Sequence, residues 1–170
     1  TCVKSDYSTN PYRPKHYLIE GNFLACNPVI LNRDFALENP FNEDRNLSAS
    51  EDYELWLRLL PKTKFVFDNE VTSYLVQHNE RSVTTMVDAE KLETRFLTFL
   101  HYMRINKEFR NYLGKDWEYF EMRNYLLLSV DLAFNKHRKK ALKYMFLALK
   151  SSKSALTQRL FWATVKHILL

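Results

Sequence analysis

Apolar residues recur at helical spacing through the second half of the chain. Leu92, Phe96, Phe99 and Met103 are three or four positions apart, so they share one face of a helix. Gly114 is expected to end a short helix, because glycine favours the end of a helix. Similar patterns predict four further helical segments, over residues 107–113, 117–135, 138–150 and 154–170. Residues 87–170 are therefore expected to form a bundle of about four helices.

The first half of the chain, residues 1–86, has a mixed pattern. Short apolar runs within residues 17–31 are consistent with a buried strand or a short helix, and a helix is expected to begin near Ser50. Residues 64–68 and 72–78 are rich in Val, Phe, Tyr and Thr, which predicts two strands. This half is therefore expected to be an α+β unit with few strands.

The composition excludes several classes of site. Hydrophobic residues make up 46% of the 170 residues, which is enough for a packed core. Gly21 and Gly114 are the only glycines, which argues against a glycine-rich phosphate loop. The two cysteines are too few for a tetrahedral thiolate zinc site and indicate no disulfide framework. No apolar run is long enough to span a membrane and no signal peptide is evident, so the cytoplasm is the expected compartment.

An acidic pair at the predicted helix start offers two interpretations. Ser48 and Glu51 match a capping box, and acidic residues in the first turn interact favourably with the helix dipole. The acidic pair can therefore be purely structural. Alternatively, one carboxylate faces a cleft and acts as a general base, which requires hydrogen-bond reach of its substrate proton. The spacing alone does not decide between these interpretations.

Residues 51–58, Glu-Asp-Tyr-Glu-Leu-Trp-Leu-Arg, resemble the Glu-Asp-x-x-Leu-Trp-x-Arg signature of the bacterial family 2 glycosyltransferases, which have the GT-A fold. The resemblance implies that Asp52 is the catalytic base of an inverting sugar transfer and that Glu51 supports acceptor binding. It also implies that Trp56 and Arg58 shape the site. The surrounding sequence, from Gly21 to Arg33 and over Phe41-Asn42-Glu43-Asp44, resembles the family as well. The resemblance covers residues 17–85 and implies that residues 1–86 are the acceptor-side, C-terminal part of a GT-A domain, with roles in polysaccharide biosynthesis at the cell envelope.

The segment after the predicted strands contains candidate diphosphate-binding residues. Tyr74, His78 and Ser82 resemble a family pattern in which the His lies near the nucleotide diphosphate and can complete a metal shell. Imidazole is a competent ligand for Mn²⁺, whereas Mg²⁺ prefers oxygen. Arg81 could pair with the diphosphate, although a solvated surface role fits it equally well. A divalent cation is therefore expected, with His78 as one ligand.

The Asp-x-Asp motif that holds the metal in this family does not occur in the chain. Nor does an alternating strand–helix series precede residue 17, although such a series would bind the nucleotide. We therefore expect the main metal ligands to lie outside this chain. We also expect that the chain alone does not transfer sugar from a nucleotide-sugar donor to a glycan or lipid-linked acceptor.

The helical tail suggests further partners. Basic and aromatic residues, including Arg159, Trp162 and Lys166, mix in the last helix, so peripheral contact with the inner face of a membrane is one expectation. Packing of an amphipathic helix on its neighbours, or in a homo-oligomer, is another. No nucleic-acid-binding motif is present, so nucleic acid is not an expected partner. A non-catalytic helical interaction module remains the alternative function for the whole chain.

Overall fold

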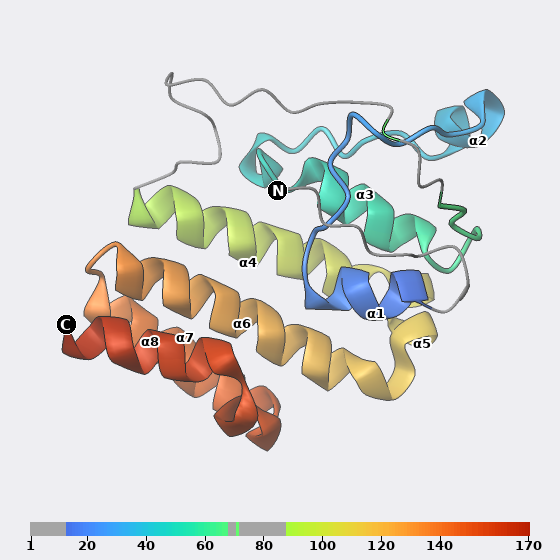
Figure 1. Cartoon of the computed structure of the whole chain (residues 1–170). Coiled ribbons are helices and arrows are strands. Elements are labelled where there is room, and N and C mark those ends of the chain that lie inside the picture. The colour runs from blue at the N-terminus through green and yellow to red at the C-terminus, as the bar shows by residue number, and fades with distance from the viewer. Residues whose placement is uncertain (1–12, 68–70, 72–87) are drawn as a thin grey trace.

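The computed structural model describes residues 13–67, 71 and 88–170, and this part of the chain is helical (Figure 1). Eight α-helices and three short 3₁₀ helices occur in these residues. The α-helices are α1 (Arg13–Glu20), α2 (Arg33–Glu38), α3 (Glu51–Leu59), α4 (Ala89–Ile105), α5 (Lys107–Leu113), α6 (Trp117–Phe134), α7 (Arg138–Ser151) and α8 (Arg159–Leu169). The 3₁₀ helices are η1 (Arg45–Leu47), η2 (Gly114–Asp116) and η3 (Lys153–Thr157).

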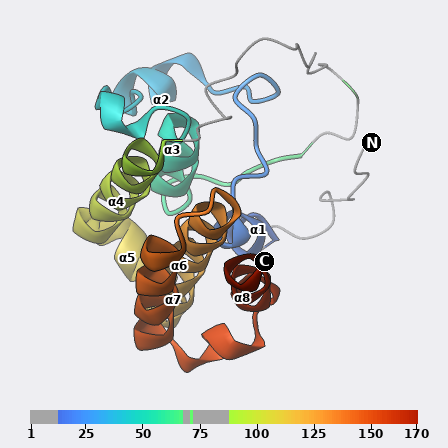
Figure 2. The ribbon, with the colours of Figure 1, turned by 90° about the vertical axis from the view of Figure 1, so that its left-hand side faces the viewer.

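Helix α6 is the centre of the bundle. It packs against α7, α8, α4 and α1, and the view in Figure 2 shows these helices gathered around it. A helix with neighbours on several sides needs apolar residues around most of its circumference. The sequence of α6 meets this need, because Phe120, Leu126, Leu128 and Leu132 are all fully buried.

The acidic-pair helix α3 lies on the bundle and shares its core. The Tyr53 ring stacks on Phe99 of α4 with centroids 4.9 Å apart, and the Tyr53 hydroxyl donates a hydrogen bond to the Leu18 carbonyl of α1. Arg123 of α6 forms an ion pair with Glu20 at 2.6 Å. One continuous hydrophobic core therefore runs from α1 and α3 into the bundle.

The predicted α+β half of a GT-A domain is wrong for the residues that the structure describes, which contain no strand and no sheet. For residues 17–31 a strand or a short helix was expected, and Tyr17 to Glu20 belong to helix α1. The residues from Lys64 to Phe67, which were expected to form a strand, lie in irregular backbone. A β-strand exists only where its backbone pairs with that of a neighbouring strand. A high β-propensity mainly reflects how well side chains pack on the surface of a sheet. Residues 64–67 have no such partner in the described part of the chain, although Phe65 packs on the core. The second predicted strand, residues 72–78, lies outside the described residues.

The helical predictions for residues 92–103, 107–113, 117–135 and 138–150 are confirmed by α4, α5, α6 and α7. Gly114 ends α5 at φ +55°, a backbone conformation that other residues rarely adopt. The last predicted helix, over residues 154–170, is divided into η3 and α8. The predicted boundary between residues 86 and 87 lies outside the described residues and stays a prediction.

Membrane-spanning helices were not expected from the sequence. Among the described residues, none of the helices combines the length and the apolar character needed to cross a bilayer.

Candidate functional site

Helix α3 holds the acidic pair on a rigid support. Leu55, Leu57 and Leu59 are buried in the core, and the Trp56 indole nitrogen donates a hydrogen bond of 3.0 Å to the Leu24 carbonyl. This bond fixes the loop that follows α1 against the side of α3. The first turn of α3 and this loop are thereby brought together, although they are about 30 residues apart in the sequence.

Asp52 is half-buried where the loop meets the helix. Its Oδ1 accepts a hydrogen bond of 3.1 Å from the Asn22 amide and one of 2.7 Å from the Tyr53 backbone N–H. Burial raises the pKa of Asp52, the hydrogen bonds from Tyr53 and Asn22 oppose this shift, and the charge of Glu51 adds to it. Because the shift is upward overall, the Asp52 carboxylate is a stronger base than an exposed aspartate.

Glu51 makes a different contact from its neighbour. Its Oε2 accepts a hydrogen bond of 2.9 Å from the backbone N–H of Ser50, the residue that precedes α3. The capping box expected between Ser48 and Glu51 does not form, because Ser48 follows η1 and the Ser50 side chain makes no capping bond. Glu51 therefore stabilises the helix start, whereas Asp52 faces the loop after α1.

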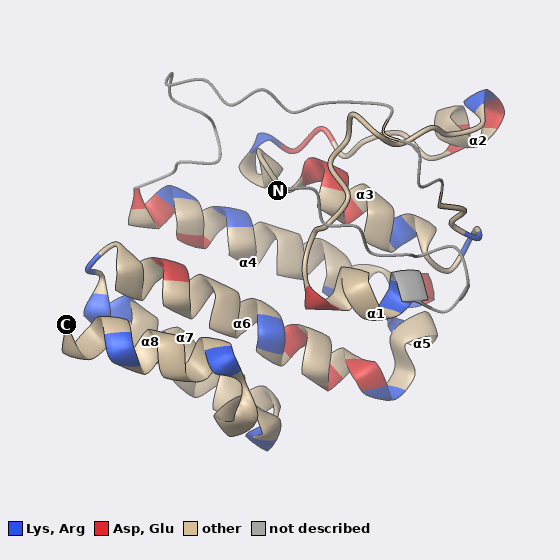
Figure 3. Cartoon of the chain, viewed as in Figure 1, with Lys and Arg blue, Asp and Glu red and all other residues tan. Residues whose placement is uncertain are grey.

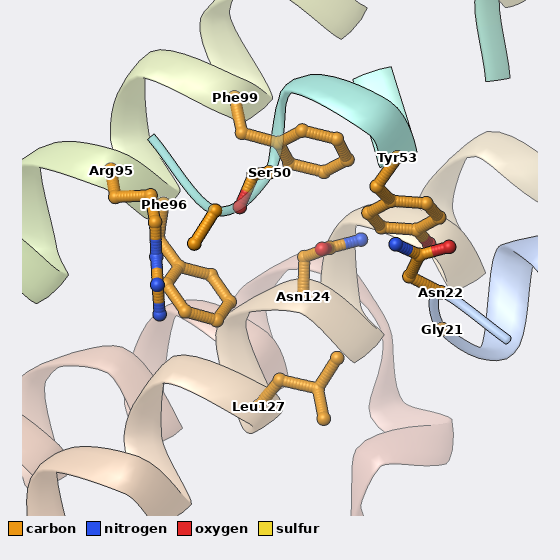
Figure 4. Close-up of a pocket in the computed structure, with 10 residues that line it drawn as sticks. Gly21, Asn22, Ser50, Tyr53, Arg95, Phe96, Phe99, Asn124 and Leu127 are labelled. Atoms are coloured by element: carbon orange, nitrogen blue, oxygen red, sulfur yellow. The ribbon is translucent and has the colours of Figure 1, made fainter. Parts of the chain in front are cut away.

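A cavity of about 200 Å³ lies beside this helix start, between the loop, α4 and α6 (Figure 4). Its walls are part polar and part aromatic. They are formed by Gly21, Asn22, Ala49, Ser50, Tyr53, Arg95, Phe96, Phe99, Asn124 and Leu127. Asp52 is not among the lining residues, and its hydrogen bond to Asn22 connects it to the cavity wall.

Among the described residues that line this cavity, Arg95 is the one cation. Its guanidinium lies 5.6 Å from the centroid of the Phe96 ring, and its Nε is buried with no hydrogen-bond partner in the described part of the chain. Burial lowers the pKa of Arg95, whereas the charges of Asp131 and Glu51 raise it. Because arginine keeps its proton in proteins, the cavity has a positive group at one side.

Trp56 and Arg58 are both used in structural contacts. Trp56 is 1% exposed and is committed to the Leu24 carbonyl. The Arg58 Nε pairs with Glu54 at 3.0 Å, and a terminal nitrogen donates a hydrogen bond of 2.6 Å to the Pro40 carbonyl. These contacts fix the direction of α3, and direct binding of substrate by either residue stays a prediction.

Gly21, by contrast, lies at the cavity. Its φ of +155° suits glycine, and no atom approaches the position that a Cβ would take within 4 Å. A side chain here would therefore meet backbone strain and not a steric clash.

The predicted diphosphate and metal residues lie outside the part of the chain that the structure describes. His78 and Arg81 belong to the segment of residues 72–87. Within the described ranges, no group of three or more His, Cys, Asp and Glu side chains is arranged to hold a metal ion. The described residues thus offer no ligand set for the expected divalent cation, and we assign no chemical step to it.

Among the cavity residues that were not predicted as site residues from the sequence are Asn22, Asn124 and Arg95. Asn22 stands in a segment that resembles the family, but its bond to Asp52 depends on how the loop folds back. Asn124 is buried in α6 and donates a hydrogen bond to the Phe120 carbonyl. Arg95 was detectable, because it lies three residues after Leu92 and four before Phe99 and so places a charge on the predicted apolar face of α4.

Comparison with known proteins found no relative. No protein-family model, no curated protein and no solved structure matches the chain.

Proposed function

We propose that this chain contributes the acceptor side of a sugar-transfer site, with Asp52 as the general base. The observation that carries the proposal is the half-buried Asp52 carboxylate, held by Asn22 on a rigid helix start next to a cavity. The sequence resemblance gives the same residue the same role. The helical fold of the described residues gives no support from fold analogy, so the proposal rests on the site.

The proposed chemistry needs one proton acceptor from this chain. As an acceptor hydroxyl attacks the anomeric carbon of the donor sugar, its proton passes to the Asp52 carboxylate. The bond from that carbon to the nucleoside diphosphate breaks, the diphosphate leaves with the bonding electrons, and the configuration inverts. A base with a raised pKa accepts the proton more readily, and the hydrogen bond from Asn22 holds the carboxylate in one orientation.

The cavity is suited to part of a sugar acceptor. Asn22, Ser50 and Asn124 offer groups that can hydrogen-bond to hydroxyls, and the Phe96 and Phe99 rings offer apolar surface. Mixed walls of this kind, largely apolar with a few placed polar groups, are typical of small-molecule sites. The nucleotide-sugar donor and its cation are proposed to bind through residues outside the described ranges, with His78 and Arg81 as the candidates in this chain.

Transfer and binding test the proposal separately. In the full gene product, supplied with nucleotide sugars, Mn²⁺ or Mg²⁺ and a panel of glycan and lipid-linked acceptors, Asp52→Asn should lower kcat by about 10²–10⁴-fold with little change in KM, because the loss of a general base affects the transition state. Asp34→Asn is the matched control, since Asp34 is exposed on α2. It should keep wild-type turnover.

Binding is measured on this chain by NMR titration with the same acceptors. We expect the amide signals of Asn22 and Asn124 to shift with an acceptor that the full product uses. Near-normal turnover in Asp52→Asn would remove Asp52 as the base. If no saccharide shifts these signals and no transfer is seen, the chain is better described as the non-catalytic interaction module.

A further inference from the structure

The charges of this chain are divided unequally along its length. Residues 132–170 contain nine of the 25 Lys and Arg residues and none of the 20 Asp and Glu residues. This segment, which comprises the end of α6 and all of α7, η3 and α8, therefore has a charge of +9, whereas residues 1–131 together have −4. Figure 3 shows the result, with Lys and Arg but no Asp or Glu on α7 and α8.

Most of these cations have no acidic partner among the residues that the structure describes. Lys140 and Lys143 form ion pairs with Glu93 of α4. The other seven are exposed, and the described residues provide no ion pair for any of them; they are Lys136, Arg138, Lys139, Lys150, Lys153, Arg159 and Lys166. Seven unpaired cations in one segment create a strongly positive surface, which attracts a polyanion.

The outer face of α8 combines these cations with large apolar side chains. Arg159, Trp162, Lys166 and Leu169 follow at spacings of three and four, so they share one face of the helix. Trp162 is 59% exposed and Leu169 is 78% exposed. The opposite face of the same helix packs on the bundle through Phe161, which is buried.

η3 extends this face. Leu156 is 50% exposed, and its carbonyl accepts a hydrogen bond of 2.9 Å from the Trp162 indole N–H. The only donor of the indole is thus already satisfied within the chain, so Trp162 can enter a less polar environment without losing a hydrogen bond to water. Lys153 is exposed and lies three positions before Leu156 in the same 3₁₀ helix, so the two residues share one face of η3. We use the term C-terminal face for the six residues Lys153, Leu156, Arg159, Trp162, Lys166 and Leu169.

We propose that the C-terminal face binds the surface of an anionic lipid bilayer, with α8 parallel to the membrane plane. The cations pair with lipid phosphate and carboxylate groups, while Trp162, Leu156 and Leu169 enter the boundary between head groups and acyl chains. This division of contacts is the one that interfacial helices make. It is independent of the proposed sugar-transfer site, which lies between α3, α4 and α6.

Charge complementarity and exposed apolar area together select this occupant. A nucleic acid would pair with the cations but would leave Trp162, Leu156 and Leu169 without an apolar environment. A second copy of the chain, joined through the same face, would bring like charges together, which is unfavourable. An anionic bilayer is the surface that satisfies both the charges and the apolar side chains.

Vesicle binding of the whole chain tests the proposal. Vesicles of phosphatidylglycerol and phosphatidylcholine should co-sediment the protein, vesicles of phosphatidylcholine alone should not, and 0.5 M salt should release it. Binding should also shift tryptophan emission to shorter wavelength. Because Trp56 and Trp117 are buried, Trp162 is the residue able to report this change, and Trp162→Phe should remove the shift.

Paired charge reversals separate this face from the rest of the surface. Arg159→Glu with Lys166→Glu should weaken vesicle binding at least about tenfold, because each cation near an anionic surface contributes to affinity. Arg33→Glu with Lys64→Glu is the matched control with the same change in net charge, since both residues are exposed and distant in sequence. The control should bind anionic vesicles at least about fivefold more strongly than the α8 variant. Circular dichroism should show that both variants are folded.

Three results would overturn the proposal. They are equal binding to neutral and anionic vesicles, equal loss in the two double variants, and absence of vesicle binding by a protein that binds single-stranded RNA tightly. The last result would identify nucleic acid as the partner of the basic segment.

Discussion

Glu51 and Asp52 are adjacent carboxylates with different surroundings. Glu51 accepts a hydrogen bond from the backbone of Ser50, which a structural carboxylate at a helix start is expected to do. Asp52 accepts one from Asn22, a residue that is 30 positions away in the sequence. A role in stabilising the helix start therefore accounts for the contact of Glu51. It does not account for the contact of Asp52 with Asn22, which belongs to the proposed site.

Asp52→Asn is predicted to leave the folded protein at least as stable as the wild type at pH 7, with a gain of no more than about 1 kcal/mol because the site is half open to solvent. Burial raises the pKa of Asp52, so its ionised form is disfavoured in the folded state, and an Asn keeps the oxygen that accepts the hydrogen bonds. The Asp52 carboxyl group binds its proton more tightly in the folded state than in the unfolded state. The stability of the wild type therefore rises toward that of the variant as the pH falls through the raised pKa of Asp52.

Urea unfolding of both proteins from pH 7 down to pH 4 measures this prediction. The stability difference between Asp52→Asn and the wild type should shrink as the pH falls. A variant that is less stable than the wild type by more than about 1 kcal/mol at pH 7 would mean that the charge of Asp52 stabilises the fold, and the base role would lose its physical support.

Elements with a repeated apolar pattern were predictable from the sequence, and those that depend on distant partners were not. Helix α4 was predicted because Leu92, Phe99 and Met103 recur at helical spacing, which needs no knowledge of the neighbouring elements. The run from Lys64 to Phe67 has strand-like composition, but composition cannot supply the neighbouring strand. The contact of Trp56 with the Leu24 carbonyl depends on how a loop folds back, so sequence spacing could not predict it.

Helix α3 contains an ion pair between the buried Glu54 and the partly buried Arg58. Glu54 is 3% exposed, and the Arg58 guanidinium is the cation that neutralises it. We predict that Arg58→Met destabilises the protein by about 3 kcal/mol, because it leaves the Glu54 carboxylate buried without its charged partner. The double variant Glu54→Leu with Arg58→Met should recover most of this loss, because both charges are then absent from the interior.

Denaturant titration of the single and double variants measures these differences. If Arg58→Met alone costs less than about 1 kcal/mol, the ion pair is not structural, and Arg58 returns as a candidate for contact with substrate. A double variant that is no more stable than the single one would indicate that Arg58 acts mainly through its bond to the Pro40 carbonyl.

The molecule as a whole joins two regions of different chemistry through one core. Helix α3 lies on α4 and α5 and the cavity lies beside α4 and α6, while the positive segment lies on α7, η3 and α8. Tyr53, Leu18 and Phe99 belong to the same hydrophobic core as the bundle residues. If both proposals hold, α6 is the element that fixes the distance between the site and the membrane surface, because it contacts helices on both sides.

A shared core predicts that α3 and the bundle unfold together. In a variant with Trp117→Phe and Trp162→Phe, Trp56 is the remaining tryptophan, so its emission reports on α3, while circular dichroism at 222 nm reports mainly on the bundle helices. The two signals should have the same urea midpoint, since coincident transitions are the mark of two-state unfolding.

Helix α3 and the bundle are expected to unfold together because of the contact surface between them. Separating residues 13–67 from the bundle exposes the Tyr53–Phe99 stack and breaks the ion pair between Glu20 of α1 and Arg123 of α6, so neither part keeps its core when the other unfolds. If the Trp56 transition instead comes at a clearly lower urea concentration than the loss of helix, residues 1–86 and 87–170 are two separate folding units. In that case the cavity between α3, α4 and α6 would form only while both units are folded, and the site would open before the basic helices melt.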